Sequence, residues 1–150
     1  MTTTLAPQAA AALAQPADAV VEATPHGLRV RPDRLVDLCR FLRDEPALAF
    51  DYLVMLTAVD YIEDDYFEVV YLLRSLGHNH ELTLKVRTDN RDDPVVPSVI
   101  DVWQTAEFQE REVYDLLGVR FAGHPDLRRL FMWDEFRGYP LRKDFLPLSQ

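Results

Sequence analysis

Residues 119–150 combine a heavy apolar load with frequent chain breaks, and this combination restricts how the chain can fold. Glycine and proline recur through the stretch, so neither helical nor strand periodicity is sustained. Exposing all of its apolar side chains would leave a larger patch than soluble monomers usually carry. We therefore expect residues 119–150 to form an extended C-terminal arm that packs on another surface. Its large apolar residues are Phe121, Leu127, Leu130, Phe131, Met132, Trp133, Phe136, Tyr139, Leu141, Phe145 and Leu146.

Charge differs between this arm and the rest of the chain. Residues 1–119 hold 21 acidic and 10 basic side chains, a net charge of −11, whereas residues 120–150 hold 4 acidic and 6 basic ones, a net charge of +2. Nucleic-acid binding needs a clustered basic surface, so the acidic body argues against a nucleic-acid partner. In the arm, Arg128, Arg129 and Arg142 would supply directional contacts, because guanidinium groups pair with carboxylates and backbone carbonyls.

Residues 20–118 show the patterns of an α+β domain. Leu35, Leu38, Cys39 and Leu42 recur at helical spacing between Pro32 and Pro46, which predicts an amphipathic helix of about three turns that buries the thiol. No apolar run approaches the roughly 18 residues of a membrane span. The single cysteine excludes internal disulfides and cysteine-rich metal or iron–sulfur sites.

Three strands are predicted after this helix. The segment 53–59 is almost wholly apolar, which predicts a central strand covered on both faces. Apolar residues then alternate with others over 67–73 and 82–86, and residues 75–80 connect these two strands as a hairpin. One or two short strands are also predicted, at residues 19–23 and 27–30 on either side of a turn.

A long helix is predicted from about Pro97–Ser98 to Gly118, which fits a left-handed cap. Its apolar stripe consists of Val99, Val102, Trp103, Ala106, Val113, Tyr114 and Leu117. Glu110 falls on the same stripe, and a buried carboxylate needs a cation or hydrogen-bond donors. On another face, Phe108 is grouped with Arg111, Glu112 and Asp115, as expected for a helix between its own sheet and a second protein.

Other segments carry weaker signals. Residues 1–19 hold one charge and neither a basic start nor a solid apolar block, so we predict a disordered leader. Asp60, Glu63, Asp64 and Asp65 form an acidic loop without the spacing of a calcium loop, which favours a solvated turn. His78 and His80 have no cysteine or third histidine nearby that would complete a zinc site.

Three motifs resemble the signature of one family. In order, they are Glu110-Arg-Glu-x-Tyr-Asp-Leu-x-Gly-Val, Phe121-x-Gly-His-Pro-Asp-Leu-Arg-Arg and Gly138-x-Pro-Leu-Arg-Lys-Asp-Phe. Their order and spacing are similar to those of the 30 kDa subunit family of NADH:quinone oxidoreductase, respiratory complex I. The resemblance extends over roughly residues 20–146.

The resemblance implies a two-layer α+β domain, residues 20–118, with a mixed, largely antiparallel sheet of four to five strands covered by helices. It implies a non-catalytic structural subunit of the peripheral arm, on the cytoplasmic side of the cell membrane and without a span of its own. The partners would be the quinone-site subunit of the 49 kDa type and the adjacent iron–sulfur subunits. FMN, iron–sulfur clusters and quinone would be bound by those other subunits, and none by this chain.

The resemblance and the side-chain chemistry together select a partner interface. Its residues are Phe108, Glu110, Arg111, Glu112, Asp115, Phe121, His124, Arg128, Arg129, Pro140, Arg142, Lys143, Asp144 and Phe145. No catalytic, cofactor-binding or metal-binding residue is predicted.

Two alternatives stay open. The chain could be the equivalent subunit of a membrane-bound hydrogenase or of a ferredoxin-dependent photosynthetic relative of complex I. A self-contained enzyme would instead use Glu110, Glu112, His124 and Asp126 as acid–base or metal-binding groups. Glu110 and Glu112 point about 200° apart on one helix, which argues against a shared site.

Overall fold

A computed structural model describes residues 3–146 of the chain. Its strands are β1 (Thr3–Thr4), β2 (Val20–Thr24), β3 (Gly27–Val30), β4 (Tyr52–Tyr61), β5 (Tyr66–Ser75), β6 (His80–Arg87), β7 (Val95–Pro97) and β8 (Arg120–Ala122). Its α-helices are α1 (Pro7–Leu13), α2 (Leu35–Asp44) and α3 (Ala106–Leu117), with 3-10 turns at Pro32–Arg34 and Ile62–Asp64.

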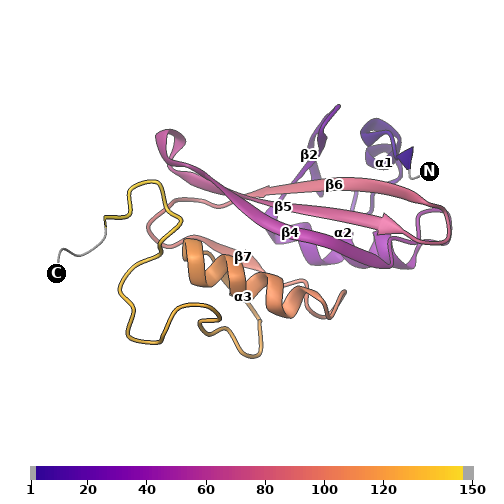
Figure 1. Ribbon diagram of the computed structural model, residues 1–150. Coiled ribbons are helices and arrows are strands. Elements are labelled where there is room, and N and C mark those ends of the chain that lie inside the picture. Colours follow the sequence, from indigo (N-terminus) through magenta and orange to yellow (C-terminus); the bar gives the residue numbers. More distant parts are fainter. Residues whose placement is uncertain (1–2, 147–150) are drawn as a thin grey trace.

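The main sheet has the order β2-β3-β6-β5-β4, and β1 also pairs with β6 (Figure 1). Strands β4, β5 and β6 are antiparallel neighbours, whereas β1 and β3 run parallel to β6. The predicted α+β fold with a mixed sheet is therefore confirmed, and so is the predicted hairpin between β5 and β6. The sheet has six strands rather than the four to five predicted, because β1 adds to it.

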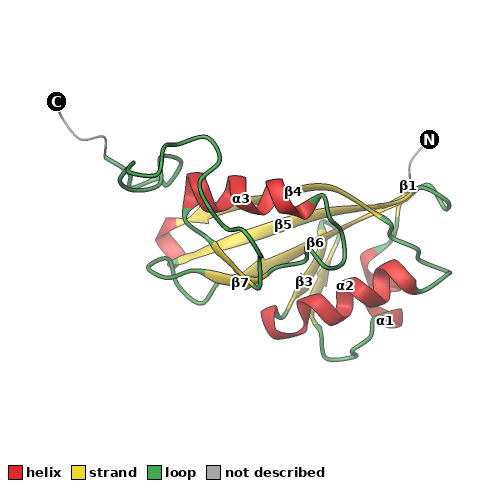
Figure 2. Ribbon diagram, turned by 90° about the horizontal axis from the view of Figure 1, so that it is seen from below, coloured by secondary structure: helices red, strands yellow, loops and turns green. Residues whose placement is uncertain are grey.

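One face of the sheet carries both α2 and α3, which lie in front of the strands when the molecule is seen from below (Figure 2). The core forms between them, where Leu38 and Leu42 of α2 and the alternating residues Phe67, Tyr71 and Leu84 are fully buried. Cys39 is buried in the same core, as predicted, and burial raises the pKa of its thiol above the ordinary value.

Strand β4 does not take the position predicted for it. Its apolar sequence predicted a central strand covered on both faces, but β4 is the edge of the sheet and, within the part of the chain that the structure describes, pairs only with β5. Leu53 and Leu56 are buried, whereas Met55 and Val59 are exposed. The prediction was wrong because an apolar sequence indicates that a strand is buried but does not show whether another element covers both of its faces.

The helix predicted to start near Pro97–Ser98 begins only at Ala106. Ser98 Oγ donates a 2.5 Å hydrogen bond to Glu110. In one continuous helix these two residues would be about 18 Å apart along the axis. The chain therefore folds back through tight turns between β7 and α3, and these turns keep Val99, Val102 and Trp103 in the core.

Part of the predicted disordered leader has regular structure. Strand β1 pairs with β6, and α1 buries Ala10 against the core. Met1 and Thr2, also in that prediction, lie outside the described residues. Within residues 3–146, no helix is long and apolar enough to cross a membrane.

Candidate functional site

Of the arm predicted over residues 119–150, residues 120–122 form β8 and residues 147–150 lie outside the described residues. The segment 123–146 is called the arm below; it contains no helix or strand and runs past the C-terminal end of α3 (Figure 1). Gly118 ends α3 with a φ of 78°, the left-handed cap that was predicted. The ring of Tyr139 and the guanidinium of Arg142 would lie 2.6 Å from a Cβ at this position. A glycine is needed both for the backbone conformation and for the close approach of the arm.

The arm also pairs with the last carbonyl groups of α3, which have no partner within the helix. The backbone N–H of Leu141 donates to the carbonyl oxygen of Leu116 at 2.9 Å. Arg142 Nε donates to the carbonyl oxygen of Leu117 at 2.6 Å. The guanidinium of Arg142 also lies over the rings of Tyr139 and Phe67. The arm therefore caps the helix on which it rests.

Asp115 is the first of two carboxylates that fix the path of the arm. Its side chain is fully buried, and its Oδ2 accepts hydrogen bonds from the backbone N–H groups of Leu130, Phe131 and Met132 at 2.6–3.2 Å. Arg129 Nη1 donates to Oδ1 at 3.1 Å. Burial alone would raise the pKa of Asp115, but these donors lower it below its ordinary value. The carboxylate thus stays ionised in its site.

Two arginines fix the arm further by donating to its carbonyl groups. Arg129 Nη2 donates to the carbonyl oxygens of Phe136 and Gly138, and its guanidinium lies over the ring of Tyr139. Arg111, buried on α3, donates to the carbonyl oxygens of Arg128 and Arg129. Both arginines make the carboxylate and carbonyl contacts expected of guanidinium groups, and all of these partners lie in the chain itself.

Asp60 is the second carboxylate and lies at the end of β4. Arg91 donates to both of its oxygens at 2.7 Å and to Asp144 of the arm at 3.0 and 3.3 Å. The backbone N–H of Lys143 also donates to Asp60. Burial opposes ionisation of Asp60, but Arg91 and the Lys143 N–H lower its pKa overall. Asp60 and Arg91 therefore tie the far end of the arm to the sheet.

Some of the large apolar side chains between these two sites face outward. Phe131, Trp133 and Leu141 are each about 60% exposed, and Phe108 on the neighbouring face of α3 is 58% exposed. The ring of Trp133 packs edge-on against Phe136 at 5.0 Å. A fixed backbone thus presents aromatic side chains to the outside, which is typical of protein-binding surfaces.

Glu110 has the buried position predicted for it. Its oxygens accept hydrogen bonds from Ser98 Oγ at 2.5 Å and from the Val99 N–H at 2.9 Å. Burial raises the pKa of Glu110 to about 7, although both donors act against the shift. Glu112 is exposed on another side of α3, so the two carboxylates do not share a site.

The remaining predicted interface residues divide by exposure. Phe121 is buried in β8, and Pro140 and Phe145 are half-buried, with Phe145 stacked on Phe136.

His124 is a hydrogen-bonding turn residue, since Nδ1 accepts from the Asp126 N–H and Nε2 donates to the Glu107 carbonyl. Arg128 pairs with Asp126, and its side chain is exposed, as is that of Lys143. The role of all fourteen residues in a partner interface remains a prediction.

Sequence reasoning missed Asp60 and Arg91 as the second site that holds the arm. Asp60 lies two and four residues after Ala58 and Leu56, so its side chain is on the same face of β4 as the buried Leu56. This alternation could have assigned Asp60 to the buried face of the strand and not to the acidic loop that follows. Arg91 lies in a loop, where no periodicity applies, so its pairing with Asp60 left no local signal. Among residues 3–146, no three His, Cys, Asp or Glu side chains are grouped so that they could hold a metal ion.

Comparisons with known proteins agree on one family. The family described as the 30 Kd subunit of respiratory-chain NADH dehydrogenase has a model that matches residues 28–150. An NADH-quinone oxidoreductase subunit from Rhizobium etli is 49% identical over 126 residues, which is 81% of this chain and 66% of that protein. An NADH-quinone oxidoreductase subunit from Moorella thermoacetica is 48% identical over 118 residues, 79% of this chain and 78% of that protein. The chain thus spans about two thirds of the length of the Rhizobium relative.

A solved structure is also similar. It belongs to the membrane-bound sulfane sulfur reductase, an archaeal respiratory membrane complex. The matching chain has a TM-score of 0.70 and 30% sequence identity, over 81% of this chain and 72% of that one. The same fold therefore occurs in a respiratory complex that is named for a different reaction.

Proposed function

The chain belongs to the family of the 30 kDa subunit of respiratory-chain NADH dehydrogenase, and from this premise we propose that it is a structural subunit of the peripheral arm of a proton-translocating NADH:quinone oxidoreductase. In this role it performs no chemistry itself but braces the quinone-site subunit, while electrons pass from NADH to quinone. The observation that carries the proposal is the family match over residues 28–150.

The geometry of the arm supports a bracing role. Two ionised carboxylates, Asp115 and Asp60, fix the backbone of the arm, while Phe131 and Trp133 remain exposed. A surface that is ordered before binding loses less conformational entropy on association. Aromatic side chains on such a surface are the residues that most often contribute large binding energies. We assign this surface to the quinone-site subunit and its iron–sulfur neighbours, which would carry the FMN, iron–sulfur clusters and quinone.

The location follows from the same proposal. A chain that joins the peripheral arm lies on the cytoplasmic side of the cell membrane and is held there by its neighbours. The acidic body and the mildly basic arm would then meet different surfaces of the complex, because like charges at an interface are unfavourable.

A second function is favoured by the sulfane sulfur reductase structure. A chain of this fold serves in that respiratory membrane complex, which is named for another reaction. The chain could therefore be the equivalent subunit of a membrane-bound hydrogenase or of a ferredoxin-dependent relative of complex I. In that case the neighbours differ, whereas the bracing role is the same.

Purification of the tagged full chain from its native membranes in mild detergent tests both functions. We expect the quinone-site, iron–sulfur, flavin and NADH-site subunits to co-purify. Hydrogenase subunits in place of the flavin and NADH-site subunits would select the second function, and recovery of the chain alone would contradict both.

A pair of variants tests the aromatic surface in the same experiment. Trp133→Ala should lower recovery of the partners about tenfold or more, the effect of losing about 1.4 kcal/mol or more of binding energy. Leu76→Ala is the matched control, because Leu76 is equally exposed but lies in the turn between β5 and β6. Equal recovery with both variants would remove the arm from the interface.

A further inference from the structure

The free edge of β4 has backbone groups available for another strand. The Leu56 N–H points away from β5 and donates to Gln109 Oε1 of α3 at 2.5 Å. Successive residues of a strand alternate the direction of their backbone groups, so Ala58 points to the same side as Leu56. The Ala58 N–H and C=O therefore face the open edge, and within residues 3–146 no backbone hydrogen bond from outside the strands reaches either group. The N–H and C=O of Ala58 are thus available to an added strand, next to Leu56, whose N–H is already bonded to the side-chain amide of Gln109.

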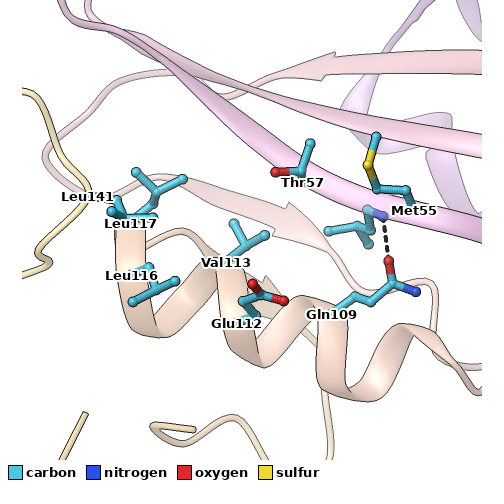
Figure 3. Close-up of a pocket in the computed structure, with 9 residues that line it drawn as sticks. Met55, Thr57, Gln109, Glu112, Val113, Leu116, Leu117 and Leu141 are labelled. Atoms are coloured by element: carbon cyan, nitrogen blue, oxygen red, sulfur yellow. Dashed lines mark hydrogen bonds between the residues drawn. The ribbon is translucent and has the colours of Figure 1, made fainter. Parts of the chain in front are cut away.

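An apolar groove runs along this edge, between β4 and α3 (Figure 3). It has a volume of about 230 Å³. Val113 extends from α3 toward the strand, Leu116 and Leu117 line the groove further along the helix, and Leu141 of the arm closes one end. The polar residues of the groove are Thr57, Gln109 and Glu112. A strand placed beside β4 would direct alternate side chains onto the apolar residues of α3.

One stretch of this edge lacks the charges and prolines that protect many exposed strands. Natural edge strands carry lysine or proline, or are covered by other elements. Residues 55–59 of β4 have neither a charge nor a proline, and Met55 and Val59 are 44% and 38% exposed. The backbone irregularity of β4 lies before this stretch, between Leu53 and Met55. The apolar sequence that predicted a covered strand is therefore still partly uncovered.

We propose that the free edge of β4 and the groove beneath it bind an extended segment of a neighbouring subunit, which adds to the sheet as a further strand. This inference rests on the proposed function, because the neighbour is a subunit of the same complex. Strand addition supplies backbone hydrogen bonds for affinity and side-chain pockets for specificity.

The chemistry of the groove defines the segment. The amide oxygen of Gln109 occupies the position that a carbonyl of the added strand would take next to Leu56. A helix has no free backbone groups in its middle to pair with Ala58, so the structure favours a strand. The added segment carries apolar residues at alternate positions and a Lys or Arg opposite the exposed Glu112.

A second copy of this chain fits the edge less well than such a segment. Two copies paired through β4 would bring together two bodies that each carry a net charge of −11 over residues 1–119. They would also place two Glu112 side chains at one interface. Like charges disfavour this arrangement, so the occupant differs from the chain itself.

Site-specific photo-crosslinking in the purified complex tests the proposal. A benzophenone amino acid is placed at Met55, and as a control at Val21, which is similarly exposed on β2 at the other edge of the sheet. We expect Met55 to crosslink to one segment of a neighbouring subunit and Val21 to give no such product. Crosslinks between copies of the chain, or no crosslink from Met55 in an intact complex, would overturn the inference.

Two variants show whether the segment binds as a strand. Ala58→Pro removes the outward N–H without removing a hydrogen bond to β5, and should lower the Met55 crosslink yield at least tenfold, whereas Ala58→Ser should retain it. Glu112→Lys changes an exposed side chain and should lower the yield by a similar factor, with an unchanged unfolding midpoint in urea as the check on its fold. An unchanged Met55 crosslink yield with Ala58→Pro or with Glu112→Lys would contradict the proposal.

This experiment separates the two proposals. If the complex co-purifies but Met55 forms no crosslink, the strand addition fails and the proposed function stands. If no other subunit co-purifies, both fail.

Discussion

In the sheet and helices of residues 20–118, large apolar side chains are buried together, as Leu38, Tyr71 and Leu84 are. In the C-terminal arm, large apolar side chains such as Phe131 and Trp133 are exposed. Its backbone path is determined instead by two pairs of charged residues, Asp115 with Arg129 and Asp60 with Arg91. Each fully buried apolar side chain contributes about 1.5–3 kcal/mol to the free energy of folding. Hydrogen bonds to charged groups contribute about 1.5–3 kcal/mol each and depend on exact geometry.

The difference has a consequence for how each region responds to change. A core of closely packed apolar side chains folds and unfolds cooperatively. A segment that is held by a few hydrogen bonds and ion pairs can instead detach while the core stays folded. We therefore expect the body to stay folded when the arm detaches, and the arm to lose its path when the body unfolds. Four experiments test this distinction.

Asp115→Ala should have the largest effect on the arm. Three backbone N–H groups and Arg129 lose their acceptor, and breaking a buried ionic contact of this kind costs about 3–5 kcal/mol. Hydrogen exchange should show lost protection at residues 130–132 and retained protection in β5 and β6. Asp126→Ala, which removes an exposed carboxylate paired with Arg128, should cost about 0.5 kcal/mol or less. Equal loss of protection in the sheet would show that the two regions are one cooperative unit.

Leu84→Ala should instead destabilise the whole molecule. A buried leucine replaced by alanine costs about 2–5 kcal/mol, and Leu84 is fully buried in β6. Urea unfolding should show a lower midpoint, and the arm should lose protection together with the sheet. The exposed Leu76→Ala should change the free energy of unfolding by about 0.5 kcal/mol at most. An arm that kept its protection in Leu84→Ala would contradict its dependence on the body.

Glu110 should give the body a pH dependence of its own. Its folded pKa of about 7 lies above the ordinary 4.5, so the folded state binds the extra proton between these values. Its contribution to stability is fully present below about pH 4.5 and is lost as the pH rises through 7, by up to about 3 kcal/mol.

The measurement is the difference in unfolding free energy between the wild type and Glu110→Gln across about pH 5–8, the range that spans the shifted pKa. Asp60 and Asp115, whose pKa values are lowered, act in the opposite direction at acid pH and are common to both proteins. A constant difference across this range would show that burial does not shift the pKa of Glu110.

Trp133→Ala should have the smallest effect on the isolated chain. Because Trp133 is 61% exposed, the free energy of unfolding should change by about 0.5 kcal/mol or less in urea. A loss comparable to that of Leu84→Ala would mean that the arm has an apolar core of its own, and the contrast between the two regions would disappear.

The sequence was most informative where burial follows a regular spacing. Phe67 and Tyr71 alternate with less buried residues, and Leu38 and Leu42 recur at helical spacing, so the core and the hairpin could be predicted. Glu110 could be placed inside because it interrupts an apolar stripe. The sequence could also indicate that a buried carboxylate there needs donors, which Ser98 and Val99 provide.

Other features could not be predicted, because the spacing of apolar residues along the chain does not show which element or side chain they contact. The turns of residues 98–105 bury Val99 and Val102 as a helix would, so the start of α3 was placed too early. The apolar stretch of β4 indicated burial but not that the strand is at an edge. The contact between Asp60 and Arg91 joins positions 31 residues apart, one of them in a loop, and therefore depends on the tertiary fold.

The short sheet formed by β7 and β8 determines how force would pass between the arm and the body. These parallel strands flank α3 in the sequence, and Ser98 and Arg120 extend their pairing by bonding to Ala122 and Pro94. A pull on the backbone at Ala122 is therefore shared by several parallel backbone hydrogen bonds to β7, and is not carried by the last turn of α3 alone. Because α3 lies between two paired strands, both of its ends are held by the same short sheet, and separating them requires breaking those strand bonds together.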